Sequence, residues 1–422
     1  MFAQNLMANS FTLKQTLNRK NLRSPMRHLK PKIVLYSHDT MGLGHMRRNI
    51  LIARTLAESQ LQANILLVSG AKEIGRFDLP NNVDCLTLPS YHKAVSGGYM
   101  AKHLDMEVRD LATLRAQTIK AAVSAFDPDL FIVDNVPRGT LKELEPILEV
   151  LNNKDKCRCI LGLRDILDAP EITTREWREQ DNVKAIEHYY EQVWIYGDPA
   201  IYDLCDAYNF GKTFRKKAKF MGYLDAKKRA APKLGAVTRL GTETIPSGLY
   251  HLCLVGGGQD GYALAKAFVQ IRHPQGVSGL LVTGPFMQPE HIAELEQLAQ
   301  HSNTQVLGFV REPCLLIQQA HRVIAMGGYN TVNEVLAFQR PTLIVPRVKP
   351  RLEQWIRAKC LSDGGFIDVL HPDQLTPEAL STWLQTVAPK QHPPEINLNG
   401  LDRLADYASQ LVNEAKKIRK IQ

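Results

Sequence analysis

The sequence predicts two doubly wound α/β domains that face each other across a cleft. Strand-length apolar runs alternate with glycine-bearing turns and helical segments, first from Lys32 onward and again from Leu249. Between these two series, residues 225–248 are rich in Lys, Ala, Gly and Pro and show little periodicity, as interdomain linkers do. We therefore expect one domain at residues 32–224 and a second at residues 249–395.

Composition narrows the class of protein. The 422 residues are 44% hydrophobic and 23% charged, which suits a globular protein of two or three domains, and no apolar run approaches the roughly 18 residues of a membrane span. The net charge of +9 suits an anionic partner such as a nucleotide. Nucleic acid is not expected, because the basic clusters lie in the tail and linker and are not interleaved with aromatic residues. Seven cysteines without a CxxC pair indicate a reducing cytoplasm and no structural metal.

The N-terminal segment, residues 1–31, has a separate character. It carries six Lys or Arg residues and no acidic residue, with scattered apolar residues between them. Three interpretations stay open: a disordered tail, a basic tether to a membrane surface, or an organelle-targeting peptide. A secretory signal is not expected, because the segment lacks an apolar core.

The first domain opens with a strand, a glycine loop and a helix, read from KIVLYSHD, TMGLGH and MRRNILIARTLAES. Gly42 and Gly44 allow the loop to approach a ligand closely. His45 lies where the helix begins, at the carboxyl edge of the predicted sheet, where ligands bind in such folds. We take it as a candidate general base; the alternative is that it caps the helix or bonds a loop carbonyl.

Two further strands of this domain end in polar residues. The run from Leu130 to Val133 is followed by Asp134, a second candidate base, although an Asp that caps the next helix is equally common. The run CRCILGL is followed by Arg164 and Asp165. Arg164 is placed to hold an anionic group of an acceptor, and a structural pair with Asp165 is the alternative.

The second domain opens with another glycine-rich turn. Leu249 to Val255 reads as a strand, and GGGQDGY follows it, so Gly257, Gly258 and Gln259 are placed to offer backbone N–H groups to a phosphate. The loop does not fit GxGxxG with a later acid, and the chain has no GxxxxGK[ST] or HExxH. Binding of NAD, P-loop phosphoryl transfer and a zinc-protease site are therefore not expected.

The most informative stretch is 326–355, MGGYNTVNEVLAFQRPTLIVPRVKPRLEQW. A strand ends before Gly328, and Asn330 and Thr331 are suitable N-cap residues for the helix that follows. The first N–H groups of that helix form an anion site suited to a diphosphate. Glu334 follows Asn330 by four residues on the same face, where its carboxylate can accept two adjacent ribose hydroxyls. An ordinary βαβ turn is the alternative.

The motif GGYNTVNEVL…PTLIVP…EQW resembles the donor-binding signature of the GT-B glycosyltransferases. It is most similar to the branch that contains the N-acetylglucosaminyltransferase that forms lipid II and the galactolipid synthases. The resemblance runs from about residue 32 to residue 385, and GLGH resembles the first glycine loop of that branch, with Leu43 inserted between the glycines. The resemblance implies that the turn at Val310 holds the base of the nucleotide and that Glu353 and Gln354 contact the donor sugar. It also implies that a helix within 396–422 returns to the first domain.

This resemblance implies glycosyl transfer from a nucleotide sugar, a UDP-sugar on the resemblance alone, to an acceptor hydroxyl with inversion. His45 or Asp134 would take the proton. The helix N-terminus would stabilise the leaving diphosphate, so neither a metal nor a cofactor is expected. The acceptor, a glycolipid, a glycan or a small molecule, is not identified, and contact with a membrane surface stays open. The alternatives are a nucleotide-sugar epimerase of the same fold and a non-catalytic nucleotide-sugar-binding protein.

Overall fold

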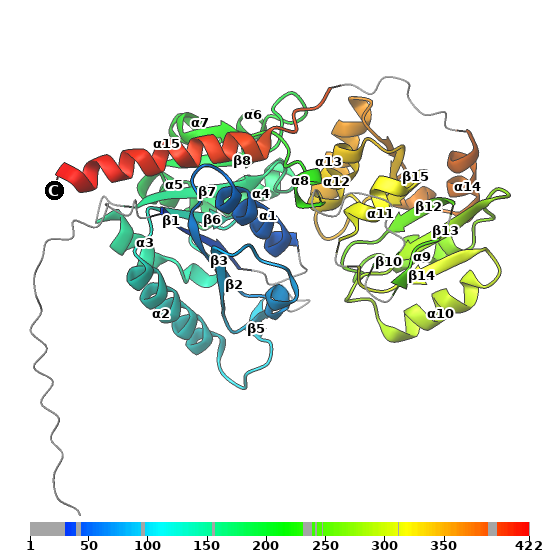
Figure 1. The fold of residues 1–422 in the computed structure, drawn as a ribbon, viewed down its shortest axis with the longest axis horizontal. Coiled ribbons are helices and arrows are strands. Elements are labelled where there is room, and N and C mark those ends of the chain that lie inside the picture. Colours follow the sequence, from blue (N-terminus) through cyan, green and yellow to red (C-terminus); the bar gives the residue numbers. More distant parts are fainter. Residues whose placement is uncertain are drawn as a thin grey trace, which may run out of the picture. The chain divides into compact units, whose positions relative to one another are not determined.

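The first series of predicted strands forms one parallel sheet in the order β3-β2-β1-β6-β7-β8-β9. The computed structural model describes residues 30–38, 44–93, 98–153, 157–230, 239–240, 243–246, 248–310, 312–386 and 395–421 (Figure 1). Residues 1–29, which include most of the basic segment, and Gly42 lie outside the described residues. The strands of this sheet are β1 (Lys32–Ser37), β2 (Asn64–Ser69), β3 (Val83–Thr87), β6 (Leu130–Asp134), β7 (Arg158–Arg164), β8 (Gln192–Tyr196) and β9 (Ala218–Phe220).

Helices cover this sheet because its central strands are apolar along their length. All five residues of β6 are buried, as expected of a strand covered on both faces. The helices between the strands are α1 (Gly44–Glu58), α2 (Val108–Phe126), α3 (Glu145–Asn152), α4 (Pro170–Glu179), α5 (Asn182–Tyr189), α6 (Leu204–Tyr208) and α7 (Lys212–Lys217). None of the helices in the described part of the chain is both long and apolar enough to cross a membrane.

The second domain repeats the plan with a parallel sheet in the order β14-β13-β12-β15-β16-β17. Its strands are β12 (Leu249–Leu254), β13 (Val277–Val282), β14 (Thr304–Leu307), β15 (Arg322–Ala325), β16 (Thr342–Ile344) and β17 (Asp368–Val369). Its helices are α9 (Tyr262–Val269), α10 (Pro289–Ala299), α11 (Cys314–Gln319), α12 (Tyr329–Phe338), α13 (Glu353–Asp363) and α14 (Pro377–Thr386). The predicted fold class, two doubly wound Rossmann-like domains, is confirmed.

Each strand order reverses at one point. In the first sheet β1 pairs with β2 on one side and with β6 on the other, and in the second sheet β12 lies between β13 and β15. Ligands of doubly wound sheets bind outside the carboxyl ends of the strands at such switch points. His45 follows β1, Asp134 ends β6, and the glycine turns follow β12 and β15, so both sets of candidates lie at a switch point.

Two segments join the domains. Within residues 225–248 the structure describes a short helix, α8 (Lys227–Ala230), and a two-stranded antiparallel pair, β10 (Arg239–Leu240) with β11 (Glu243–Thr244). The terminal helix α15 (Gly400–Ile421) contacts α1, β6 and β7, and Arg403 donates a hydrogen bond to the carbonyl of Phe220 at 3.1 Å. The last helix therefore packs on the first domain, as Figure 1 shows in red.

The start of α12 differs from the prediction. Asn330 and Thr331 were expected to cap this helix, but both lie inside it, and the N-cap is Gly328, which makes no side-chain capping bond. Gly328 adopts an extended conformation with φ −64° and ψ 141°. The helix therefore starts two residues earlier than the capping preferences of Asn and Thr suggested. The N–H groups of its first turn follow the glycine turn directly.

A chain of three histidines lies at the amino edge of the second sheet. His251 of β12 is buried, and its ring nitrogens contact His273 Nδ1 at 3.1 Å and His321 Nδ1 at 3.5 Å. Burial, together with the charges of neighbouring His273, His321 and Arg322, lowers the pKa of His251 to about 3. Burial also lowers the pKa of His273 to about 4. The folded protein thus holds these rings neutral at pH values where an unfolded chain would protonate them.

The three neighbouring histidines predict that the free energy of unfolding falls at acidic pH. Each histidine has a folded-state pKa below the unfolded value near 6.5, so its contribution is complete above pH 6.5 and is lost as the pH falls toward 4. The loss is about 1.4 kcal/mol per pH unit for a fully shifted group. Urea unfolding at pH 7.5 and pH 5 should show a loss of stability in wild type that exceeds the loss in His251→Leu by about 1–2 kcal/mol. The exposed His103→Leu is the control and should behave as wild type; equal losses in all three proteins would contradict the prediction.

Candidate active site

The structure brings the two candidate bases together. His45 is the second residue of α1, Asp134 is the last residue of β6, and His45 Nδ1 lies 2.5 Å from Asp134 Oδ2. Arg48, three residues after His45 and so on the same side of the helix, donates to Asp134 Oδ1 through Nε at 3.0 Å and Nη2 at 2.6 Å. Sequence reasoning offered His45 and Asp134 as alternatives; they form one unit.

The electrostatics of this unit assign different chemistry to its members. Burial would raise the pKa of Asp134, but the charges of Arg48 and His45 outweigh burial and hold this pKa well below its usual range. An ionised carboxylate only accepts hydrogen bonds, so His45 Nδ1 carries the proton and donates it to Asp134. Arg48 Nη2, 2.9 Å from the same nitrogen, has no lone pair to offer and directs its N–H to Asp134.

In the neutral form of His45 the lone pair is therefore on Nε2. A neutral imidazole whose Nδ1–H is held by a carboxylate is oriented to take a proton at its other nitrogen. Asp134 is a poor base at neutral pH, because its carboxyl group has so low a pKa and both its oxygens are bonded. Of the two candidate bases, the geometry favours His45, with Asp134 as the residue that orients it.

The glycine turn after β12 has little room for side chains. Gly258 has φ +93°, and a Cβ there would lie 2.3 Å from the carbonyl oxygen of Thr283. A Cβ at Gly257 would lie 3.3 Å from the ring of Phe286, whose N–H donates to the Gly257 carbonyl at 2.9 Å. Gln259 is exposed on the same turn. At Gly257 and Gly258 the turn thus presents backbone, as a phosphate contact through N–H groups requires.

The first turn of α12 contacts the start of α1. Asn330 Nδ2 donates to the carbonyl oxygen of Gly44 at 2.8 Å, so a predicted donor-side residue touches a predicted acceptor-side glycine. Tyr329 donates from its hydroxyl to the Tyr196 carbonyl at 2.8 Å, and the Arg48 guanidinium lies over the Tyr329 ring at 5.3 Å. The two switch points are therefore linked through α1 and α12.

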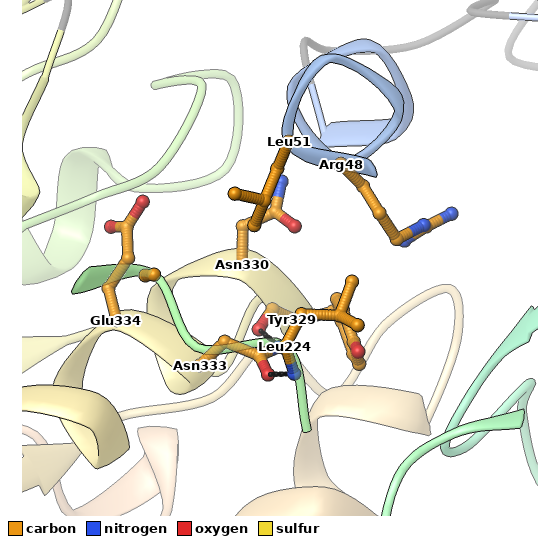
Figure 2. A pocket seen from close by; sticks show the side chains of 8 residues that line it. Arg48, Leu51, Leu224, Tyr329, Asn330, Asn333 and Glu334 are labelled. Carbon is orange, nitrogen blue, oxygen red and sulfur yellow. Dashed lines mark hydrogen bonds between the residues drawn. The ribbon is translucent and has the colours of Figure 1, made fainter. Parts of the chain in front are cut away.

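Glu334 is not exposed to solvent as the ribose contact would suggest. Its side chain is 2% exposed, and its Oε1 accepts from Arg47 Nη2 at 3.3 Å. A ribose at Glu334 would therefore share this carboxylate with Arg47 or displace it. A pocket between α1 and α12 has Glu334 and Asn330 in its wall (Figure 2). The pocket is lined by Arg48, Leu51, Leu224, Ala226, Tyr329, Asn330, Asn333 and Glu334.

The predicted sugar-contacting residues are held by an arginine that sequence reasoning missed. Arg347 donates to Glu353 Oε1 at 2.9 Å and to Asp260 of the glycine turn at 2.9 Å, while its backbone N–H donates to Gln354 Oε1 at 3.0 Å. Glu353 is 4% exposed, and its Oε2 has no hydrogen-bond partner among the described residues. Glu353 Oε2 is thus a candidate acceptor for a sugar hydroxyl.

Val310 and Arg164 complete the predicted set. The Val310 side chain is buried in the core, so only its backbone is placed to hold a nucleobase, while the neighbouring Phe309 is 38% exposed.

Arg164 does not pair with Asp165, because Asp165 pairs with Arg357 at 2.7 Å. Burial lowers the pKa of Arg164 although the charge of Glu353 raises it, and its Nε has no partner among the described residues. Arg164 thus lies near the Glu353 side of the site.

Sequence reasoning missed Arg48, Arg47 and Arg347. A signal existed for the first two, because Arg47 and Arg48 follow His45 by two and three residues in HMRR, at the start of the same helix. No local signal pointed to Arg347, whose partners lie in the glycine turn after β12 and at the start of α13. Among the described residues, no three His, Cys, Asp or Glu side chains are arranged to hold a metal ion.

Solved structures with a similar fold include glycosyltransferases. The kitacinnamycin glycotransferase superposes with a TM-score of 0.54 at 16% identity over 93% of this chain and 99% of its own. The calicheamicin glycosyltransferase CalG4 gives 0.54 at 13% identity over 93% and 98%. The UDP-GlcNAc 2-epimerase of Neisseria meningitidis gives 0.57 at 11% identity over 92% and 100%. The fold is therefore GT-B, and the resemblance found in the sequence is confirmed.

Sequence comparison also finds similarity to glycosyltransferases. Residues 252–410 match the family model described as the glycosyltransferase family 28 C-terminal domain. An uncharacterized glycosyltransferase of Methanosarcina mazei is 25% identical over 77% of this chain and 82% of its own length. Another, of Methanosarcina acetivorans, is 23% identical over 90% and 95%. The chain thus has the GT-B fold, and its second domain is similar to the C-terminal domain of glycosyltransferase family 28.

Proposed function

We propose that this protein transfers a hexosyl or N-acetylhexosaminyl group from a UDP-sugar to an acceptor hydroxyl with inversion, without a metal or cofactor. The observation that carries the proposal is the His45–Asp134 unit at one switch point, linked by the Asn330–Gly44 contact to the glycine turn of the other. In this proposal the second domain binds the donor and the first binds the acceptor. The family 28 match over residues 252–410 supports a donor on the second domain.

The donor is held by two glycine turns and two acidic residues. Gly257, Gly258 and Gln259, with the first turn of α12 from Gly328 through Thr331, receive the diphosphate. Glu334 accepts the ribose hydroxyls after its bond to Arg47 is exchanged for them. Asn330 changes partner in the same way, from the Gly44 carbonyl to a phosphate oxygen.

The donor sugar and the nucleobase are held at the edges of this diphosphate site. The backbone beside Val310 holds the nucleobase. Glu353 Oε2 and the Gln354 amide contact the donor sugar. Arg164 assists on the acceptor side or along this sugar, where its unpaired Nε donates.

The chemical step needs one proton transfer and one displacement. His45 Nε2 takes the proton of the acceptor hydroxyl as its oxygen attacks the anomeric carbon. The bond from that carbon to the diphosphate breaks on the opposite face, and its electron pair stays on the β-phosphate oxygen, which gives inversion. The N–H groups at the start of α12 stabilise the charge that develops there. Asp134 and Arg48 keep the His45 tautomer that this step requires.

A thermal-shift screen tests the donor site. Purified protein is heated with UDP, GDP, dTDP or CMP and their common sugars, without added metal. Stabilisation by uridine nucleotides is expected, because a ligand at about 100 times its dissociation constant adds roughly 2.7 kcal/mol. Glu334→Ala should lose most of the shift, and Glu296→Ala, on the exposed side of α10, should retain it. No shift with any nucleotide would refute the donor site.

Product analysis separates transfer from epimerisation, the activity named for one solved structure of similar fold. An epimerase needs acid and base groups on both faces of the sugar, whereas His45 and Asp134 act here as one unit on one side. We expect free UDP and a glycosylated acceptor. A new UDP-sugar without an acceptor would favour the epimerase, and nucleotide binding without any product would favour a binding protein.

A further inference from the structure

Two polar residues flank the His45–Asp134 unit without a role in it. Tyr36 of β1 pairs with Val133 of β6 in the parallel register. His38 and Asn135 each follow two residues later, so they occupy equivalent positions just beyond the carboxyl ends of these neighbouring strands. Both follow carboxyl ends at the switch point of the first domain, where a doubly wound fold binds its ligand. They lie beside the proposed base and are not needed to hold it.

His38 is a neutral histidine against the ring of the base. The centroids of the His38 and His45 rings are 4.7 Å apart, and His38 is 9% exposed. Burial, followed by the charge of His45, lowers the pKa of His38 to about 3, so the ring carries one N–H and one lone pair at any physiological pH. Its Nδ1 is buried and has no hydrogen-bond partner in the described part of the chain.

Asn135 repeats this pattern in a strained backbone. Its φ of +66° lies in the left-handed region, which costs free energy for a residue other than glycine. Its backbone N–H is bonded to the Gly162 carbonyl at 2.8 Å, while its Oδ1 is buried with no partner among the described residues. Strain at a ligand-binding edge and an unsatisfied buried acceptor are both typical of a residue held for a ligand.

A hydroxyl group has the chemistry to satisfy one atom of each kind. With its proton on Nδ1, His38 donates to the hydroxyl oxygen, and the hydroxyl proton is donated to Asn135 Oδ1. A carboxylate or phosphate would satisfy His38 but would place negative charge against the Asn135 oxygen and near ionised Asp134. The pair of orphaned atoms therefore matches a neutral hydroxyl better than an anion.

We propose that His38 and Asn135 bind a second hydroxyl of the acceptor, adjacent to the one that His45 deprotonates, so that the acceptor is a sugar or another polyol with neighbouring hydroxyls. The proposal rests on the proposed function, because it takes the His45 side as the acceptor side. It assigns His38 and Asn135 to specificity: they select an acceptor with paired hydroxyls over one with a single hydroxyl.

The test compares two kinds of acceptor with one UDP-sugar that the wild type accepts. The paired-hydroxyl probes are methyl glycosides and glycerol, and the single-hydroxyl probes are an aliphatic alcohol and 4-nitrophenol. His38→Phe keeps a ring but removes Nδ1, whereas His38→Asn returns a polar atom near the position of Nδ1. Asn135→Gly relieves the positive φ and removes Oδ1, and Asn209→Gly, at the left-handed C-cap of α6 with φ +46°, is the matched backbone control.

Wild type should prefer the polyol probes, and His38→Phe and Asn135→Gly should lower their kcat/KM by about 10–100-fold more than that of the single-hydroxyl probes. His38→Asn should restore much of the preference, and Asn209→Gly should keep all of it. Equal losses for both kinds of acceptor, or a wild type without preference, would overturn the proposal. If no probe is glycosylated, the proposed function fails for these acceptors. Saturation-transfer NMR of methyl glycosides with wild type and His38→Phe then decides the inference: binding lost in the variant supports it, and binding that is absent or unchanged overturns it.

Discussion

Replacing His45 by alanine is expected to lower the turnover number for glycosyl transfer by about 10²–10⁴-fold. The His45 side chain supplies the lone pair that takes the acceptor proton, and no other described group is positioned by Asp134 in this way. The imidazole also contacts the buried carboxylate at 2.5 Å, but Arg48 still pairs with that carboxylate after the change, so the fold should persist. Turnover is measured as UDP release with a saturating acceptor.

Two measurements separate loss of the base from loss of structure. The thermal shift produced by UDP should equal that of wild type, because His45 does not contact the proposed donor site. The control His188→Ala removes an exposed imidazole from α5 and should leave turnover unchanged. A His45→Ala enzyme with full turnover would exclude His45 from the mechanism.

The fold was predictable from sequence because its determinants are local. Strands such as KIVLYS and LFIVD contain a run of consecutive apolar residues without alternation, as expected of strands buried on both faces of a parallel sheet. The polar residues that follow them mark the carboxyl edges, and in doubly wound folds these edges bind ligands. Both sheets, and the strands that precede each glycine turn, therefore agree with the prediction.

The relations within the site were not predictable, because they join residues that are far apart in the chain. His45 and Asp134 are 89 residues apart, and Arg47 and Glu334 are 287 residues apart. From local patterns, His45 and Asp134 were predicted as alternative bases, and Glu334 was predicted to be open to a ribose. Only the bonds from α1 to Asp134 of β6 and to Glu334 of α12 show that one carboxylate orients a base and that the other is already bonded. The predicted cap of α12 was wrong for a different reason, because Gly328 adopts the extended cap conformation without any side chain.

Replacing Arg357 by methionine is expected to lower the free energy of unfolding by about 3–5 kcal/mol, the usual cost of leaving a buried charge unpaired. Arg357 is fully buried on α13, and it donates to Asp165 through Nε at 2.9 and 3.0 Å and through Nη2 at 2.7 Å. Without it, the Asp165 carboxylate loses these bonds in a region without solvent. Chemical unfolding in urea measures the change.

The same helix supplies a matched control. Lys359 pairs with Asp363 at 2.6 Å, but the two side chains are 53% and 62% exposed, so Lys359→Met should cost less than about 0.5 kcal/mol. A similar loss for both variants would contradict a special role for burial.

The double variant Arg357→Met with Asp165→Leu separates stability from function. It replaces the buried pair with apolar side chains, so it should regain most of the stability lost in Arg357→Met alone. Arg357 also donates to the carbonyl oxygen of Gly327 at 3.0 Å, and Gly327 belongs to the turn that leads into α12. The double variant restores packing but not this bond between the first domain, α13 and the proposed diphosphate turn. We therefore expect it to fold well and still to bind UDP more weakly than wild type, measured by calorimetry; wild-type affinity would show that the Arg357 bond to Gly327 serves folding alone.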